Sequence, residues 1–264
     1  MRSRRLPVIL ILWIGVALSA CSNTLSLDKN PATGSTASAF DTSEGTDTAP
    51  MNPLNPNERV YNAGPRQVIE NPSVAEIMKT GPLPEMSFGR PDAPVTVIKY
   101  MSLTCPYCRK FHAEVFPELK KNYIDTGKVR FILREFPIGR SSGNATIALR
   151  CAPADKYLTL YGKFLSQQGK WVSQDVRLDS IYEVAQQVGM TRAQFDSCLQ
   201  DKKLIAGLKW VKDRGRTLGI IGTPNFFVDG KLVKKVLSYQ DLSTMVDAAL
   251  AGGAPAPAAT AATR

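Results

Sequence analysis

The stretch SLTCPYCRKFH, residues 102–112, places two cysteines three positions apart where an apolar run gives way to a helical pattern. The overlapping run VTVIKYMSLT, residues 95–104, is almost continuously apolar, which is typical of a strand covered on both faces. Residues 106–127 predict a helix that bends at Pro117, because proline removes a backbone donor and crowds the preceding turn. The alternating stretch KVRFILREFP, residues 128–137, predicts a second strand. The cysteine pair therefore lies at the strand-to-helix corner of a predicted β-α-β unit.

A helical block separates this unit from the remaining strands. Between residues 141 and 216, four stretches have apolar residues three and four positions apart, and Asp179 and Thr191 are residue types that cap helices. Strand patterns return on both sides of the Asp-Gly pair at 229–230, a dipeptide typical of hairpin turns, and residues 238–250 predict a closing helix. Removal of the block leaves β-α-β followed by β-β-α. The predicted parts are the first half of an α/β fold (residues 84–139), an all-helical insertion (140–217) and the second half of the fold (218–250).

The first 21 residues have the pattern of an export signal. Three arginines precede residues 6–20, an uncharged and mostly apolar stretch that is short for a membrane span. This stretch leads into LSAC, residues 18–21, which resembles the lipobox of bacterial lipoproteins. We therefore expect cleavage before Cys21 and lipidation of that residue. The alternative is ordinary cleavage after the small residues, which leaves Cys21 as a free thiol.

Low-complexity segments flank the core. Residues 22–70 are rich in Ser, Thr, Asn, Pro and Gly and predict a flexible tether, and residues 251–264 have a similar composition. The net charge of +10 falls to +7 without the three arginines of the signal, and the basic residues are scattered without an aromatic platform. We therefore expect no nucleic-acid binding, and an exported basic protein suits the anionic surface of a bacterial envelope. The predicted location is the periplasmic side of the cell envelope, with a lipid anchor in the inner or the outer membrane.

Export affects how the other cysteines are interpreted, because disulfides persist outside the cytosol. Four remain, and they allow three pairings between which the sequence does not choose. They are Cys105, Cys108, Cys151 and Cys198. A zinc site would need two more ligands at metal-like spacing, and Cys151 and Cys198 form no second Cys-X-X-Cys motif, so we expect no metal. A purely structural disulfide in CPYC would close too short a loop to constrain the unfolded chain, so the pattern favours a redox-active pair.

The predicted start of the helix gives this pair its chemistry. Cys105 falls at the N-cap and Pro106 at the first helical position, where a missing N–H group is harmless. The sulfur of Cys105 then faces unpaired N–H groups and the positive end of the helix dipole, which favour thiolate over thiol. Cys108 lies one turn further on, where it can form a disulfide with Cys105 while shielded from solvent. This arrangement stabilises the reduced pair, and so it makes the disulfide an oxidant.

The chain resembles the thioredoxin superfamily, and within it the exported DsbA-like disulfide oxidoreductases. The resemblance covers residues 84–250 and rests on CPYC after an apolar strand, on the helical insertion and on GTPNFFVDG at residues 222–230. It implies a thioredoxin fold in which Pro224 follows a cis peptide bond and faces the cysteine pair, while the backbone of Thr223 pairs with a bound substrate peptide. The site residues that it implies beside the cysteines are Pro106, Tyr107, Thr223 and Pro224.

Lys99 and His112 are further candidates near this pair. Members of the family often carry an acidic residue in the strand before the cysteines, where this chain has Lys99. If Lys99 points beneath the cysteines, its charge favours the thiolate; the alternative is a stem on the sheet with the amine in water. His112 is seven residues after Cys105, on the same helical face but about 10 Å along the axis. We expect a packed, hydrogen-bonded histidine, with modulation of Cys108 as the alternative.

A second disulfide is predicted between Cys151 and Cys198, which fall in different helices of the insertion. Some DsbA-like relatives carry a disulfide in their helical domain, so the resemblance supports this pairing. Two buried free thiols are the alternative.

The resemblance implies thiol:disulfide oxidoreductase activity with no cofactor beyond the redox-active disulfide. The first hypothesis is an oxidase that makes disulfides in exported proteins with free thiols and is reoxidised by a quinone-linked membrane partner. The second is an isomerase or reductase that a different membrane partner keeps reduced. Against the second hypothesis, dedicated isomerases usually carry a dimerisation domain, and the region before Pro84 is too polar to form one. We expect a monomer. The third is a lipid-anchored protein that uses the same scaffold only for binding.

Overall fold

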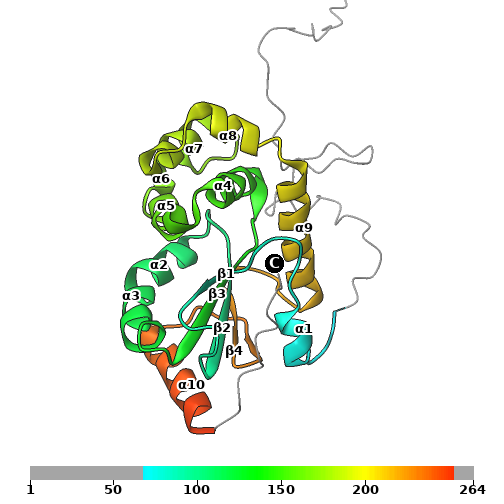
Figure 1. Ribbon diagram of the computed structural model, residues 1–264, viewed down its shortest axis with the longest axis vertical. Helices are drawn as coiled ribbons and strands as arrows, with labels where there is room; N and C mark the ends of the chain where they lie inside the picture. The colour runs from blue at the N-terminus through cyan, green and yellow to red at the C-terminus, as the bar shows by residue number, and fades with distance from the viewer. Residues whose placement is uncertain (1–67, 253–264) are drawn as a thin grey trace, which may run out of the picture. The chain divides into compact units, whose positions relative to one another are not determined.

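The computed structural model describes residues 68–252, and Figure 1 shows helices arranged around a central sheet. The predicted signal with Cys21, nearly all of the tether and the tail from residue 253 lie outside the described residues. Within 68–252, no helix is both long and apolar enough to cross a bilayer.

Five strands form the sheet in the order β1-β3-β2-β4-β5. They are β1 (Met86–Phe88), β2 (Val95–Met101), β3 (Val129–Glu135), β4 (Asn225–Val228) and β5 (Lys231–Val233). The central strands β2 and β3 are parallel, and every other neighbouring pair is antiparallel. The predicted α/β fold, with β-α-β followed by β-β-α around a helical insertion, is confirmed. Strand β1 is an addition at the edge that the sequence did not predict, because three residues are too few to show an alternating pattern.

Helices cover the sheet and form the insertion. Those outside the insertion are α1 (Val74–Met78), α2 (Pro106–Glu114), α3 (Phe116–Leu119) with the π-helical turn η1 (Lys120–Ile124), and α10 (Tyr239–Gly252). The insertion holds α4 (Gly139–Cys151), η2 (Ala154–Lys156), α5 (Tyr157–Ser166), α6 (Gln168–Trp171), α7 (Leu178–Ala185), η3 (Gln186–Val188), α8 (Arg192–Cys198) and α9 (Lys202–Thr217). In Figure 1, α4 to α8 lie together at one end of the sheet, and α9 returns alongside it.

Local signals place most helix boundaries. The predicted bend at Pro117 is a break: α2 ends at Glu114, and α3 begins at Phe116 with proline in its first turn, where no N–H is required. The prediction of a cap at Thr191 is confirmed, because its hydroxyl accepts a hydrogen bond from the Gln194 N–H in a capping box. The prediction of a cap at Asp179 is wrong. This carboxylate lies inside the first turn of α7 and pairs instead with Arg192 on α8.

The two faces of the sheet carry different cores. On β2, Ile98 and Tyr100 point into a small cluster with residues of α1 and β3 and with the segment after α9. Val97 and Met101 point to the opposite face, into the large cluster that α2, α3, α5 and α10 cover. Because side chains alternate along a strand, Lys99 shares this second face and lies beneath α2 and the insertion.

Candidate active site

Cys105 forms the N-cap of α2, as the sequence predicted. Strand β2 ends at Met101, and after a short turn the chain enters the helix at Pro106. The sulfur of Cys105 accepts a hydrogen bond from the N–H of Cys108, with nitrogen and sulfur 3.3 Å apart. Cys105 is partly exposed, whereas Cys108 is fully buried, and both are free thiols in this structure. Cys105 is therefore the sulfur that another molecule can reach.

The environments of Cys105 and Cys108 shift the pKa values of the two thiols in opposite directions. A hydrogen bond from the Cys108 thiol, supported by the N–H groups of Cys108 and Tyr107, lowers the pKa of Cys105 to about 6, although partial burial opposes this shift. Burial raises the pKa of Cys108 well above its ordinary value, and the hydrogen bond to Cys105 adds to the shift. At neutral pH Cys105 is mostly thiolate and Cys108 remains a thiol.

The loop before β4 meets the pair from a distant part of the chain. The peptide bond between Thr223 and Pro224 is cis. In its protonated form, Cys105 donates a hydrogen bond to the Thr223 carbonyl, with sulfur and oxygen 3.1 Å apart across 118 positions of sequence. The structure thus brings together Cys105, Thr223 and Pro224 in the arrangement that the resemblance implies.

Lys99 is buried against α2, the helix that begins at the cysteine pair. Its side chain is only 1% exposed, so the alternative with its amine in water is wrong. The amine donates a hydrogen bond to the Tyr161 hydroxyl at 3.1 Å and lies 4.1 Å from the centroid of the Phe111 ring. Burial lowers the pKa of Lys99 to about 8, and the electrostatic interactions with Cys108 and Cys105 in their ionised forms oppose that shift.

His112 is packed beside Lys99 on α2. Its ring stacks on Phe116, with centroids 5.5 Å apart, and meets the edge of Tyr161 at 4.9 Å. The prediction of packing holds, but Nδ1 is buried without a hydrogen-bond partner among the described residues. Burial, with the positive charge of Lys99, lowers the pKa of His112 to about 4. This imidazole is therefore neutral at physiological pH.

Side chains of the insertion hold the active-site turn in place, and the sequence did not identify them. The Gln168 side-chain amide donates to the carbonyls of Leu103 and Cys105, at 2.7 and 3.1 Å. The hydroxyls of Ser102 and Ser142 lie 2.8 Å apart, which joins the turn after β2 to the first turns of α4. No local pattern marks a glutamine or serine for such a role, because each partner is at least 40 positions away.

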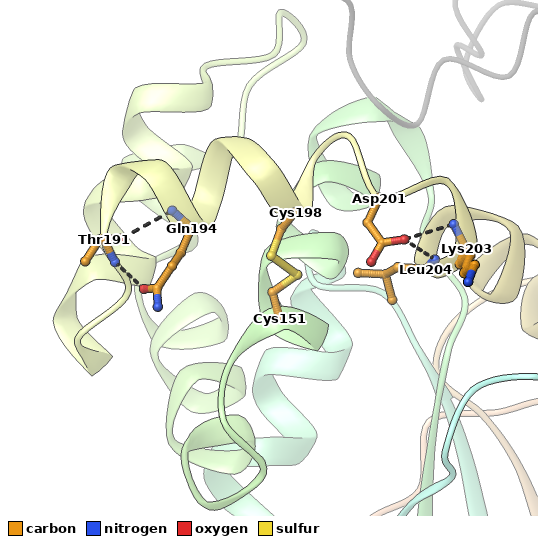
Figure 2. Close-up of a disulfide and its surroundings, with 7 residues drawn as sticks. All are labelled: Cys151, Thr191, Gln194, Cys198, Asp201, Lys203 and Leu204. Atoms are coloured by element: carbon orange, nitrogen blue, oxygen red, sulfur yellow. Dashed lines mark hydrogen bonds between the residues drawn. A yellow bond between two sulfur atoms is a disulfide. The ribbon is translucent and has the colours of Figure 1, made fainter.

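The remaining cysteines form a disulfide inside the insertion (Figure 2). Cys151 ends α4 and Cys198 ends α8, with their Cα atoms 6.2 Å apart. This disulfide is one of the three pairings that four cysteines allow. Under it, Cys105 and Cys108 are the two cysteines that remain to form the redox-active pair. Figure 2 places the disulfide between the Thr191 capping box and the N-cap of α9. Residues 68–252 contain no cluster of three His, Cys, Asp or Glu side chains that could hold a metal ion.

Comparison with known proteins agrees with this geometry. Residues 83–248 match the family model for thioredoxin. A Rickettsia bellii protein named as a protein-disulfide oxidoreductase is 31% identical over 191 residues, which are 70% of this chain and 72% of that protein. A probable disulfide bond formation protein D of Bacillus anthracis is 29% identical over 171 residues, which are 62% of this chain and 77% of that protein. The crystal structure of Wolbachia pipientis alpha-DsbA1 is similar with a TM-score of 0.61 and 27% identity, over 67% of this chain and 96% of that one. The chain therefore belongs to the thioredoxin superfamily, as a DsbA-like protein.

Proposed function

We propose that this chain is a protein thiol oxidase, which introduces disulfides into exported proteins by exchange through Cys105 and Cys108. The observation that carries the proposal is the contrast between the two sulfurs. Cys105 is accessible and has a pKa of about 6, and Cys108 is buried with a raised pKa. Because an ionised Cys105 is stabilised in the reduced enzyme, the enzyme disulfide accepts electrons readily.

The exchange needs two steps. A client thiolate attacks the Cys105 sulfur of the enzyme disulfide, the S–S bond breaks, and the departing Cys108 sulfur takes up a proton. A second client thiolate then attacks the client sulfur in this mixed disulfide. The client disulfide forms and Cys105 leaves as a thiolate, a good leaving group because of its low pKa. Two electrons pass from the client to the enzyme pair.

The surface near Cys105 suits clients that are not yet folded. Tyr107, within the motif, is 56% exposed, and Ile221, two residues before Thr223, is 79% exposed. Large apolar side chains in water favour partners that themselves expose apolar segments. The Thr223 backbone, which meets Cys105, is placed to pair with an extended client peptide. We assign Pro106, Tyr107, Thr223 and Pro224 to this client site.

The setting proposed for this activity is the bacterial cell envelope. A lipid on Cys21 anchors the protein, the segment before residue 68 tethers it, and the catalytic part works as a monomer on the periplasmic side. A quinone-linked membrane protein restores the disulfide, and no cofactor beyond the disulfide takes part. The named relatives support disulfide chemistry in general, and the choice of oxidation over isomerisation comes from the stabilised Cys105 thiolate.

Two assays on the same preparation test the proposal. Reduced, unfolded ribonuclease is incubated with the oxidised enzyme, and insulin is incubated with the enzyme and a reductant. An oxidase regenerates ribonuclease activity and is weak in reducing insulin. The reverse result would identify a reductase or isomerase, and inactivity in both assays would identify a binding protein. Cys105→Ser is the control that must abolish the activity.

A further inference from the structure

We propose that the buried amine of Lys99 accepts one of the two protons that a client dithiol gives up, and so becomes the counter-ion of the Cys105 thiolate. This role rests on the proposed exchange at Cys105 and assigns Lys99 as a positioning residue of that site.

Lys99 is buried without a carboxylate partner. No acidic side chain in residues 68–252 forms an ion pair with it, and its hydrogen bond goes to the Tyr161 hydroxyl. The buried carboxylate of Glu135 is already occupied by the Arg150 guanidinium and the Tyr157 hydroxyl. A buried ammonium without a counter-ion is costly, so the amine is charged when a negative group is near and neutral when that group is absent.

The group that can supply this charge near neutral pH is the Cys105 thiolate, because Cys108 remains a thiol. From α2, Cys105, Cys108 and His112 interact electrostatically with Lys99, and α5 contributes Tyr161. His112 is neutral above a pKa of about 4, and burial raises the pKa of Tyr161 far above its ordinary value, so neither carries charge near pH 7. The two partner strands place apolar Leu133 and Phe226 beside Lys99. The charge near Lys99 is therefore controlled by the redox state of the cysteines.

The proton balance follows from this arrangement. The oxidised enzyme holds a neutral Cys105–Cys108 disulfide and a neutral Lys99 amine. A client dithiol brings two electrons and two protons. After exchange the enzyme holds a Cys105 thiolate, a Cys108 thiol and a Lys99 ammonium, and the client holds a disulfide. Both protons are retained at the site and its total charge is unchanged in this half of the cycle. The two protons leave later, when the membrane partner takes up two electrons and the disulfide forms again.

The pKa values set the pH range of this effect. In the reduced enzyme the pKa of Lys99 is about 8, a value that already includes the raising effect of the cysteine charges. Oxidation removes those charges, so the pKa of Lys99 in the disulfide form is lower. Between the two values, reduction transfers a proton to Lys99. Above the higher value the amine is neutral in both forms, and below the lower value it is charged in both.

The test measures protons released when the enzyme disulfide is reduced by one equivalent of dithiothreitol in weakly buffered solution with an indicator dye. Dithiothreitol gives up two protons, of which Cys108 takes one. Without uptake by Lys99, about one proton per disulfide is released, and this is expected for Lys99→Met and Lys99→Arg. The wild-type protein should release fewer protons per disulfide than these variants. We call this difference the shortfall, and it should be largest below about pH 8 and absent above about pH 9. Thiolate absorbance at 240 nm in the same samples accounts for protons on Cys105.

Two further variants sharpen the result. Lys212→Met removes another buried lysine, which belongs to α9 and lies over the Phe136 ring. Its proton release should match that of the wild type. Tyr161→Phe removes the acceptor of the Lys99 ammonium, so the shortfall should move to lower pH; this readout remains if Lys99→Met does not fold. Equal proton release by wild type and Lys99→Arg at every pH from 6 to 9 would overturn the proposal. The measurement uses only the enzyme's own disulfide, so its outcome is independent of the ribonuclease and insulin assays.

Discussion

Replacement of Cys108 by alanine should make Cys105 a weaker acid. The largest influence that lowers the pKa of Cys105 to about 6 is the hydrogen bond from the Cys108 thiol. A hydrogen bond to a charged group contributes about 1.5–3 kcal/mol, and the lower end applies because Cys105 is partly exposed to solvent. At about 1.4 kcal/mol per pKa unit, the loss corresponds to a rise of about one unit. The titration midpoint of the Cys105 thiol in Cys108→Ala is therefore expected at about 7.

The assay is the absorbance of the thiolate at 240 nm, followed from pH 4 to 9 in the reduced protein. Cys108→Ser is the matched control, because a hydroxyl of similar size restores a donor, and its midpoint should lie closer to the wild-type value than that of Cys108→Ala. Cys105→Ser supplies the baseline. It should show no transition below pH 8, since the pKa of Cys108 is raised well above its ordinary value.

The outcome that refutes the reasoning is a midpoint for Cys108→Ala equal to or below that of the wild type. In that case the helix terminus alone, with its N–H groups and dipole, would account for the ionised sulfur. In either case, the direction in which the stability of the reduced protein changes with pH is defined. Because the pKa of Cys105 is depressed from 9.0 to about 6, the extra stability of the reduced form is complete above pH 9, declines as the pH falls, and is lost as the pH passes through about 6.

Two further perturbations test the insertion and its attachment to the sheet. Arg150→Met leaves the fully buried Glu135 carboxylate without its guanidinium, which should cost about 3–5 kcal/mol, and calorimetry should show a Tm lower by on the order of 10 °C. A loss under 1 kcal/mol would contradict the importance of this ion pair. Replacement of Cys151 and Cys198 by serine opens a loop with a sequence separation of 47. Urea unfolding should show a loss of up to about 4 kcal/mol, and unchanged stability would mean that the disulfide does not constrain the unfolded chain.

Much of the fold follows from signals that act over a few residues. The apolar run of β2, the Pro106 helix start and the Thr191 cap each depend on neighbours within one turn or one strand. Such signals act through backbone hydrogen bonds and side-chain period, so they can be read directly from the sequence. The same locality predicted the central chemistry, since the N-cap position of Cys105 requires only the first turn of α2.

Two features of the fold differ from the prediction because a short stretch of sequence does not fix them. Asp179 has the chemistry of a cap, but it lies within the first turn of α7 and pairs with Arg192, 13 positions later. Strand β1 exists because β3 offers it a free edge, a property that its own three residues do not contain.

The sequence by itself determined that Cys105 caps the start of a helix, because capping and proline placement are local. Only the tertiary structure decided that Lys99 is buried against α2 and α5, that the Thr223 carbonyl meets Cys105, and that Gln168 holds the active-site turn. The hydrogen bonds of these contacts join segments about 60 to 120 positions apart, and which face of a buried strand meets which helix depends on how the whole core packs.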